Sequence, residues 1–314
     1  MAHGCNSGRA GEARGTRLPA LLLLLLATVA GCLWVTQRSA AAELRVVDDA
    51  GREVVLPAPA RRIVSLAPHL TEQLFHIGAG ARVVGTVEFS DFPPAARAIP
   101  RIGGSGGVDL ERLLALRPDL VVAWSSGNPK RVIDRLARLR IPVYLDEPRG
   151  LADIARSLER LGALSGRDAA GAAAAAEFME RARALAARYR DRLPVRVFYQ
   201  VLDPRLITVN GDHLISELLS TCGGVNVFAE LPVLAPIVSE EAVLARDPDA
   251  IVAGGTEGEW ERWAKRWRER AQLKAVRRGA LYFVAADLVH RHSVRVLEGA
   301  ERLCAALDDA RRRR

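Results

Sequence analysis

The stretch VDLERLLALRPDLVV, residues 108–122, returns 130 residues later as VSEEAVLARDPDAIV, residues 238–252. Val, Glu, Leu, Ala, Pro, Asp and Val occupy identical offsets in the two copies. Each copy begins with a helix N-cap residue, Asp109 or Ser239, and ends at Pro-Asp before an apolar run typical of a buried strand. A helix leading into a strand is a common unit, so coincidence is the alternative. A true repeat predicts two similar α/β lobes with a ligand cleft between them.

Apolar runs alternate with amphipathic segments on either side of both copies. Residues 43–57 alternate around Asp-Asp-Ala-Gly, which predicts a hairpin, and β-type and helix-type segments take turns from residue 62 onward. Residues 168–192 are rich in Ala and free of Pro, which predicts one continuous helix of about 25 residues. The predicted fold class is α/β, with two Rossmann-like lobes that have mainly parallel sheets and are joined by one long rigid helix. Such a connection favours a preformed cleft over hinge closure.

This pattern also predicts the domain boundaries. A targeting segment, either a signal peptide or a lipoprotein signal, covers residues 1–42. After it come the N-terminal lobe at 43–165, the connecting helix at 166–193, the C-terminal lobe at 194–310 and a basic tail at 311–314.

The formal net charge of +8 is concentrated at the two ends of the chain. Residues 1–42 carry four arginines and one glutamate, and residues 311–314 are all arginine. The body of the chain is therefore nearly neutral and has no basic stripe interleaved with aromatic residues. The sequence predicts no nucleic-acid binding.

The N-terminal segment has the features of an export signal. Arginines precede the uncharged stretch 18–37, whose centre is LPALLLLLLATVAGC, and small residues follow it, which predicts a periplasmic protein. Residues 29–32, VAGC, resemble a lipoprotein box with Cys32 as the lipidated residue. Residues 40–42, all Ala before Glu43, resemble an ordinary signal-peptidase site instead. A third route leaves the stretch uncleaved as a membrane anchor, because it is long enough to span a bilayer.

The cysteines point to one disulfide. Cys5 and Cys32 lie in the targeting segment, which leaves Cys222 and Cys304 in the body of the chain. Two thiols in an oxidising compartment favour a disulfide between them, and a metal site is the alternative.

Strong motifs of the common enzyme classes are lacking. GGSGG at residues 103–107 lacks the Gly-Lys-Ser/Thr ending of a phosphate-binding loop, and a plain loop is its simplest interpretation. The chain has no HExxH. This disfavours an enzyme, and the predicted cleft between two lobes favours a binding protein without a catalytic cofactor. An exported hydrolase or redox enzyme is the competing class.

Several stretches together resemble the periplasmic cobalamin-binding proteins of bacterial ABC importers. They are RRIVSLAPHLTEQLFHIGA, FSDFPP, DLERLLALRPDLVVAW, STCGGVNVF, VSEEAVLARDPDAIV and ERLCAAL, and the resemblance runs from about Arg61 to Leu307. The wider class of helical-backbone binding proteins also serves siderophores, haem and metal ions. The resemblance implies a monomeric substrate-binding protein that captures cobalamin or a related corrinoid and delivers it to a permease dimer in the inner membrane.

The resemblance also assigns roles to residues outside the ligand site. Glu111 and Glu241 match the two lobe-tip glutamates that form salt bridges with permease arginines in the family. The alternative is that each is only a first-turn carboxylate that stabilises its helix through the dipole. Cys222 and Cys304 match the family's disulfide.

For the ligand site, the resemblance implies aromatic surfaces and one loop. Phe89 takes the place of a family Tyr that packs on the corrinoid, and Trp124 matches an aromatic residue in the cleft. The loop DLVHR aligns with a ligand-contacting loop in which only Asp287 and Arg291 keep their identity. His69, just past the first strand of the lobe, is a further candidate for lining the cleft. The predicted ligand-binding residues are Phe89, Trp124, Asp287, Leu288, Val289, His290, Arg291 and His69.

Two departures from the family pattern leave room for another ligand, because Ser105 and Ala235 stand where the family has Trp. The alternative is a haem-binding or ferric-siderophore-binding protein of the same class. His290 or His292 would then supply an axial ligand to haem iron, or Arg291 with Arg295 would meet an anionic iron chelate. The sequence shows no set of three His plus a carboxylate at strand ends for a bare zinc or manganese ion.

Overall fold

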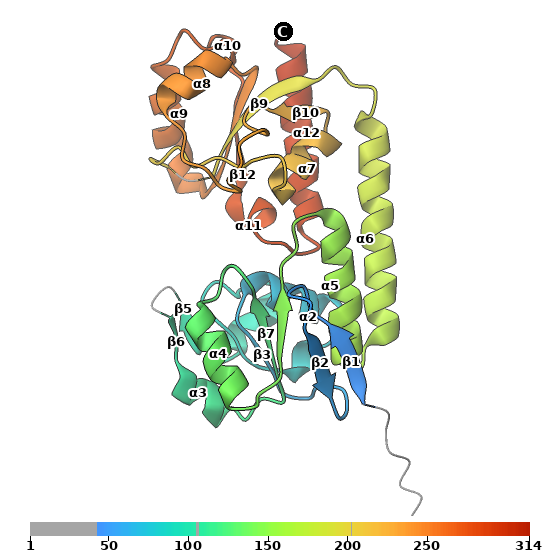
Figure 1. The fold of residues 1–314 in the computed structure, drawn as a ribbon. Helices are drawn as coiled ribbons and strands as arrows, with labels where there is room; N and C mark the ends of the chain where they lie inside the picture. Colours follow the sequence, from blue (N-terminus) through green and yellow to red (C-terminus); the bar gives the residue numbers. More distant parts are fainter. Residues whose placement is uncertain (1–42, 105–106, 202) are drawn as a thin grey trace, which may run out of the picture. The chain divides into compact units, whose positions relative to one another are not determined.

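The computed structural model describes residues 43–104, 107–201 and 203–314. In this part of the chain two α/β lobes follow one another, and helices α5 (Leu151–Leu164) and α6 (Asp168–Tyr189) run side by side where the chain passes from one lobe to the other (Figure 1). The predicted two-lobed α/β class is confirmed.

The N-terminal lobe is built on a parallel sheet with the strand order β4-β3-β7-β8. An antiparallel hairpin of β1 and β2, with Leu44 opposite Leu56, precedes the sheet as the alternation of residues 43–57 predicts. The elements of this lobe are β1 (Leu44–Val47), β2 (Glu53–Leu56), β3 (Ile63–Ser65), α2 (Pro68–His76), η1 (Gly80–Arg82), β4 (Val83–Gly85), η2 (Pro94–Ala98), β5 (Gly103–Gly104), β6 (Gly107–Val108), α3 (Leu110–Ala115), β7 (Leu120–Trp124), α4 (Lys130–Arg138) and β8 (Val143–Asp146).

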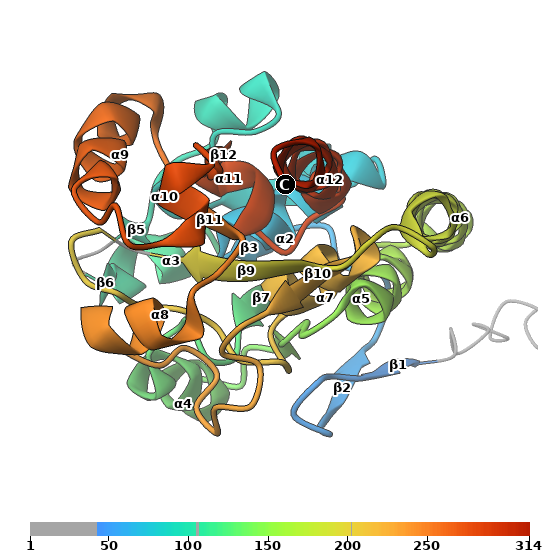
Figure 2. The ribbon, with the colours of Figure 1, turned by 90° about the horizontal axis from the view of Figure 1, so that it is seen from above.

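The C-terminal lobe repeats this plan with the parallel order β10-β9-β11-β12. Viewed from above, α6 lies beside α5 (Figure 2). The elements of this lobe are β9 (Val195–Gln200), α7 (Leu214–Thr221), β10 (Gly224–Asn226), α8 (Glu240–Arg246), β11 (Ala250–Gly255), η3 (Glu257–Glu259), α9 (Trp260–Arg268), α10 (Lys274–Arg277), β12 (Leu281–Ala285), α11 (Ala286–Val289) and α12 (Val296–Arg312).

The two copies of the sequence repeat form the same unit in both lobes. Helix α3 leads into β7 and helix α8 leads into β11. The side chains of Asp109 and Ser239 accept hydrogen bonds from the N3 amides of these helices, which is the N-cap role predicted for them. Asp119 accepts from the backbone N–H of Arg62, and Asp249 accepts from that of Arg196, at 2.9 Å and 3.1 Å. The aspartate of each Pro-Asp pair thus ties the repeat to the neighbouring strand.

Close packing of α5 against α6 depends on two glycines. A Cβ on Gly171 would lie 2.6 Å from the carbonyl oxygen of Leu158, and one on Gly162 would lie 3.0 Å from the Cα of Gly171. Helix α6 also packs against α7 and α12 of the C-terminal lobe. At 22 residues it is about 33 Å long, so it spans from one lobe to the other.

One hydrophobic core continues through both lobes. Leu70 and Leu161 of the N-terminal lobe, Phe178 of α6, and Val197 and Leu303 of the C-terminal lobe belong to the same cluster of buried side chains. Separate clusters cover the other face of each sheet. A shared core opposes large movements of one lobe against the other, as the prediction of a preformed cleft requires.

The end of the chain differs from the predicted boundary at residue 311. Helix α12 continues through Arg312, and the chain end packs on the C-terminal lobe instead of forming a free basic tail. The Arg311 guanidinium donates to the carbonyl oxygens of Leu193 at 2.7 Å and Cys222 at 2.6 Å. Arg314 pairs with Asp249 at 2.9 Å. These carbonyls and this carboxylate give the terminal arginines partners that a sequence pattern does not reveal.

No helix in the described part of the chain is both long enough and apolar enough to cross a membrane. The predictions for residues 1–42, which include the export signal, the cleavage sites and lipidation of Cys32, lie outside the described residues. Ser105 lies outside them as well.

Candidate functional site: the cleft between the lobes

A cavity of about 530 Å³ opens between the two lobes. Much of its lining comes from the carboxyl ends of strands and the segments that follow them, as expected for open parallel sheets. The N-terminal lobe contributes Phe89 and Asp91, and the C-terminal lobe contributes residues that include Phe283, Asp287, His290 and Arg291. Four of the predicted ligand-binding residues, Phe89, Asp287, His290 and Arg291, are therefore brought together at this cavity.

The N-terminal lobe adds a second cavity of about 420 Å³, and Phe89 lines both. Trp124, the last residue of β7, lines the second cavity together with Leu66 and Pro68. The Asn128 side chain accepts from the Trp124 amide at 2.7 Å and donates to the Leu66 carbonyl at 3.0 Å. This bridge ties the ends of β3 and β7 together and sets the position of the tryptophan.

Phe89 is held in an exposed position by its backbone and its neighbour. Its φ is 63°, a left-handed conformation that is unusual for a bulky residue, and its side chain is 68% exposed. The next residue, Ser90, is fully buried, and its carbonyl accepts from Arg101 at 2.8 Å. Strained backbone of this kind is often found at ligand sites, and here it presents an aromatic ring to the cleft.

The C-terminal lobe adds a smaller cavity of about 170 Å³ at the ends of β9, β11 and β12. Gln200, Gly254, Trp263 and His290 are among the residues that line it, and His290 also lines the cavity between the lobes. The side-chain amide oxygen of Gln200, Oε1, accepts from the indole N–H groups of Trp263 at 2.8 Å and Trp267 at 3.0 Å.

A cluster of aromatic rings lies beneath Trp124. The ring centroids of Trp124 and His69 are 5.6 Å apart, and His292 is 5.7 Å from each of them. His213 extends the cluster, with its ring 6.4 Å from that of His292. Because His69 belongs to the N-terminal lobe while His213 and His292 belong to the C-terminal lobe, these rings join the two lobes below the cleft.

Three histidines in this region, His213, His290 and His292, are held neutral by burial. Burial lowers the pKa of His213 to about 4, and it lowers that of His290 to about 4 with a contribution from His213. The pKa of His292 falls to about 3, because burial is reinforced by the neighbouring His69, His213 and His290. At neutral pH these imidazoles therefore act as polar, uncharged groups.

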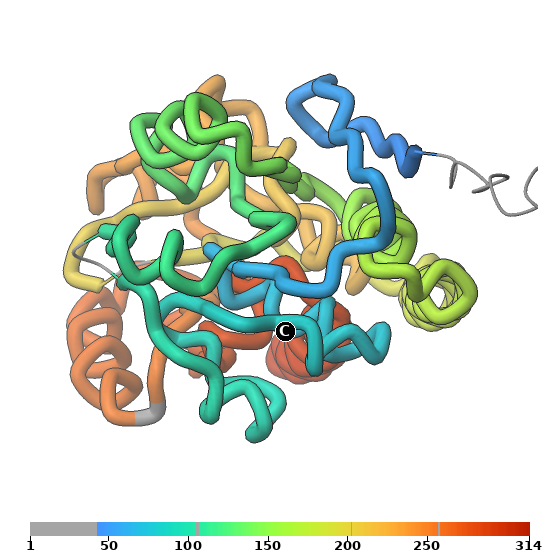
Figure 3. Tube along the Cα trace, turned by 90° about the horizontal axis from the view of Figure 1, so that it is seen from below, coloured from blue at the N-terminus to red at the C-terminus, as the bar shows by residue number. Residues whose placement is uncertain are grey.

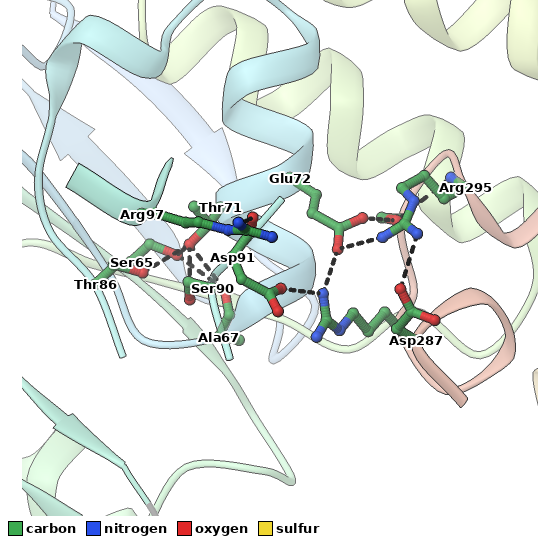
Figure 4. A network of polar contacts seen from close by, with 12 residues as sticks. Ser65, Ala67, Thr71, Glu72, Thr86, Ser90, Asp91, Arg97, Asp287 and Arg295 are labelled. Atoms are coloured by element: carbon green, nitrogen blue, oxygen red, sulfur yellow. Dashed lines mark hydrogen bonds and ion pairs between the residues drawn. The ribbon is translucent and has the colours of Figure 1, made fainter. Parts of the chain in front are cut away.

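A network of charged groups crosses the lobe interface beside the cleft (Figure 4). Glu72 of α2, with a side chain only 1% exposed, accepts from Arg291 at 2.9 Å and from Arg295 at 3.3 Å. Arg291 also donates to Asp91, and Arg295 also donates to Asp287 at 2.8 Å. Partial burial is the largest single influence on the pKa of Asp91 and would raise it. The hydrogen bond with Arg291 and the positive charge of Arg291, together with smaller contributions, outweigh burial and lower the pKa. The paired charges hold Arg291 and Asp287 in place at the cavity wall.

Three of the predicted ligand-binding residues do not fit that role. Leu288 and Val289 are 2% and 1% exposed, and Val289 belongs to the hydrophobic core, because one turn of α11 turns both side chains inward. His69 is 3% exposed and lies 3.3 Å from the buried Asp146 carboxylate, beneath Trp124 and away from the described lining of the cavities.

Glu111 and Glu241 occupy equivalent, exposed positions on the first turns of α3 and α8. A backbone hydrogen bond and a hydrogen bond with Ser239 lower the pKa of Glu241. Both carboxylates are therefore accessible to a partner, which docking requires.

The predicted disulfide is confirmed. Cys222, at the end of α7, and Cys304, in α12, are joined by a bond of 2.05 Å, and both are fully buried. The bond closes a loop within the C-terminal lobe with a sequence separation of 82. Among the described residues, no group of three or more His, Cys, Asp or Glu side chains is placed to hold a metal ion.

Sequence reasoning missed Tyr199, His213, Glu72 and Asp146 as parts of the site region. Tyr199 lies within a strand that reads as a buried apolar run, and only its hydroxyl contact with His290 distinguishes it. In the sequence Glu72 belongs to a short polar run with Thr71 and Gln73, and the burial of these side chains appears only in the structure.

Comparison with known proteins places this architecture in a family. Residues 63–288 match the family described as Periplasmic binding protein. The vitamin B12-binding protein of Vibrio cholerae serotype O1 is 36% identical over 262 residues, which cover 82% of this chain and 92% of that protein. The vitamin B12-binding protein of Yersinia pestis (strain Pestoides F) is 35% identical over 252 residues, with coverage of 80% and 88%.

Solved structures show the same fold. The crystal structure of the periplasmic vitamin B12-binding protein of Vibrio cholerae matches with a TM-score of 0.74 at 36% identity, covering 81% of this chain and 98% of that one. The periplasmic haem-binding protein from Roseiflexus sp. RS-1 in its apo form matches with a TM-score of 0.71 at 22% identity, covering 80% and 99%, which shows the fold alone. The chain belongs to the periplasmic binding protein family, a family of substrate-binding transport proteins.

Proposed function

We propose that this protein captures vitamin B12 or a related corrinoid in the periplasm and delivers it to an ABC permease of the inner membrane. The observation that carries the proposal is the cavity shared by the two lobes, with Phe89 exposed at its edge and Trp124 in the adjoining cavity. Curated relatives that cover most of the chain at 36% and 35% identity are named vitamin B12-binding proteins, which supports the same ligand.

The chemistry of the cleft suits a corrinoid. A corrin ring presents a broad, largely apolar face, and flat aromatic side chains such as Phe89 and Trp124 match such a face. The amide side arms of the corrin need polar partners, and Asp287, His290 and Arg291 line the same cavity. The cavities of about 530 Å³ and 420 Å³ meet at Phe89, so one large ligand can contact both walls.

The ligand is transported and not transformed in this proposal. The protein is therefore not an enzyme, and corrinoid is its cargo and not a catalytic cofactor. The aromatic walls and paired charges provide binding and orientation. The proposal includes a monomeric binding protein in the periplasm, exported by residues 1–42 and either released by cleavage or anchored through Cys32 or the uncleaved segment.

Docking to the permease is assigned to Glu111 and Glu241. Both side chains are exposed, and each occupies the first turn of the equivalent helix in its lobe. A pair of equivalent carboxylates fits a permease dimer with two equivalent basic sites.

The haem alternative needs an imidazole nitrogen that can reach iron at the cleft. His292 is 9% exposed and lies among His69, Trp124 and His213. The Nε2 atom of His290 already contacts the hydroxyl of Tyr199 at 3.0 Å. For an anionic iron chelate, Arg291 and Arg295 are already paired with Glu72, Asp91 and Asp287. These contacts favour the corrinoid over both alternatives.

Isothermal titration calorimetry of the exported protein with cyanocobalamin, haemin and ferrichrome tests the proposal. We expect one-to-one binding of cyanocobalamin and no comparable heat with haemin or ferrichrome. Visible spectra of the same mixtures provide a second readout, since each ligand is coloured. Tight binding of haemin or ferrichrome without binding of cyanocobalamin would contradict the proposal.

A further inference from the structure

A buried tyrosine hydroxyl and a histidine at the cleft form a hydrogen-bonded pair. Tyr199 in β9 is fully buried, and its Oη atom lies 3.0 Å from Nε2 of His290, at the end of α11. The two rings meet edge to face, with centroids 6.1 Å apart. No other partner of this hydroxyl occurs among the described residues.

Strand β11 has a glycine where the two rings come together. A Cβ on Gly254 of β11 would lie 2.5 Å from both Nε2 of His290 and Oη of Tyr199. Any side chain at that position would push the two groups apart. The glycine is therefore required by the close approach of the rings and not by its backbone angles.

The pair fixes which nitrogen of His290 carries the proton. A buried hydroxyl that donates to nothing is destabilising, because it has lost its hydrogen bond to water without replacement, so the Tyr199 proton must reach an acceptor. Burial keeps the His290 ring neutral at neutral pH, because its pKa is lowered to about 4. In a neutral imidazole one nitrogen accepts and the other donates. Nε2 therefore accepts from Tyr199, and the proton of the ring resides on Nδ1.

The Nδ1 atom has no hydrogen-bond partner in the described part of the chain, and His290 lines both the cavity between the lobes and the smaller one beside it. We infer that Tyr199 locks His290 in the Nδ1–H tautomer, so that His290 offers the cleft ligand a hydrogen-bond donor. Tyr199 is the positioning residue, and His290 contacts the ligand.

This assignment rests on the proposed function and narrows it to one type of ligand group. A donor at Nδ1 is complementary to a carbonyl oxygen, such as that of a corrin amide side arm, or to another oxygen acceptor. It is unsuited to coordinate a metal, since Nδ1 holds a proton and the Nε2 lone pair is used by Tyr199. The hydrogen bond from Tyr199 to His290 therefore favours an amide-rich ligand over a metal centre that needs an axial imidazole.

The tautomer can be read without any ligand. In the exported protein with 15N-labelled histidine, two-dimensional NMR distinguishes a protonated ring nitrogen from one with a free lone pair. We expect the proton of His290 on Nδ1, with the signal assigned by its loss in His290→Asn. In Tyr199→Phe the ring should populate the other tautomer. A His290 ring protonated on Nε2 in the wild-type protein would contradict the inferred role of Tyr199.

Binding of cyanocobalamin tests the donor role. His290→Ala should raise the dissociation constant by roughly three- to tenfold, the range of one neutral hydrogen bond. His290→Asn keeps an N–H the same number of bonds from Cα as Nδ1, and it should restore most of the affinity. Tyr199→Phe should show a smaller loss than His290→Ala.

Tyr282→Phe is the matched control, because it also removes a tyrosine hydroxyl hydrogen bond in the C-terminal lobe, at 2.8 Å to Asp309, away from the described lining of the cleft. It should leave both the tautomer and the affinity unchanged. Gly254→Ala is a second route to the same defect if Tyr199→Phe is poorly folded. Unchanged affinity in a folded His290→Ala variant would overturn the donor role. If the wild-type protein fails to bind cyanocobalamin, both the proposed function and the donor role of His290 are contradicted. The NMR measurement tests the tautomer of His290 independently of any ligand.

Discussion

The two lobes share one backbone plan but differ where their strands end at the cleft. Arg62 donates to the carbonyl of Leu116 at the end of α3, and Arg196 donates to the carbonyl of Arg246 at the end of α8. The residues that follow, Arg117 and Asp247, both have left-handed backbone, with φ of 45° and 40°. Figure 1 shows each lobe built on its sheet, and Figure 3 follows the same chain as a tube seen from below.

At the cleft the equivalent positions carry opposite residues. Trp124 ends β7, and 130 residues later Gly254 lies near the end of β11. The tryptophan fills space over Gly127 and contacts His69, whereas the glycine leaves room for His290 and Tyr199. The helix and strand of the repeat meet the same packing constraints in both lobes, whereas the residues that line the cleft can differ between the lobes. An asymmetric ligand is then met by two different walls.

The strongest loss of function should follow from changing two residues that are equivalent in the two lobes. Charge reversal at both Glu111 and Glu241 should abolish corrinoid uptake in cells and leave affinity in solution intact, because both groups are exposed and away from the described lining of the cleft. Each single Glu→Lys change should give only a partial loss, since a rim ion pair contributes little alone. Normal uptake by the double variant would show that helix-dipole stabilisation is their whole role.

The second prediction concerns the disulfide, which distinguishes the C-terminal lobe from the N-terminal lobe, since residues 43–165 contain no cysteine. Replacing Cys222 and Cys304 by Ser should lower the free energy of unfolding by on the order of 4 kcal/mol, the chain-entropy value for a loop of this length. Thermal unfolding of the variant and of reduced wild-type protein should agree. Two free thiols in denatured, unreduced wild-type protein would show that the disulfide does not form.

Acid sensitivity should come mainly from the C-terminal side of the cleft, which holds His213, His290 and His292. Their pKa values are lowered to about 4, 4 and 3, so between those values and about 6.5 the unfolded chain binds more protons than the folded one. Stability should therefore fall as pH decreases from 6.5 to 4, by on the order of 2 kcal/mol for each group by pH 5.

Thermal unfolding across this pH range measures the effect. His292→Asn should flatten the profile, and the exposed residue His76 supplies the control substitution His76→Asn. A wild-type profile that is flat between pH 7 and pH 4.5 would show that the cluster is not buried in neutral form.

The smallest expected effect concerns the tryptophan at the cleft. Trp124→Ala should weaken binding of cyanocobalamin by roughly 1 to 3 kcal/mol, the scale of a buried aromatic contact, and should change fold stability less. Calorimetry and thermal unfolding measure the two quantities. If the Trp124→Ala variant binds cyanocobalamin with the dissociation constant of the wild-type protein, Trp124 packs on the neighbouring histidines and does not contact the ligand.

Much of the fold could be predicted because it depends on local chemistry. Caps such as Asp109 and Ser239, the Pro-Asp turns and the Ala-rich α6 are consequences of short-range hydrogen bonding and helix propensity. The pairing of Cys222 with Cys304 follows from the cysteine count. The strand-end rule also placed Phe89, Trp124 and Asp287 beside cavities, because side chains at the carboxyl ends of parallel strands share one edge.

The inward turn of Leu288 and Val289 depends on how a single turn of α11 packs on the core, and no local pattern distinguishes it from an outward one. The Glu72 pairs with Arg291 and Arg295 join residues more than 200 positions apart, and so does the contact of His69 with His292. The repeated α/β unit, the disulfide and the ends of the strands can thus be read from the chain alone, because they follow from local propensity, periodicity and composition. Which polar groups are buried together, and hence the tautomer and charge at the cleft, depends on the three-dimensional fold, because burial and pairing are set by long-range packing.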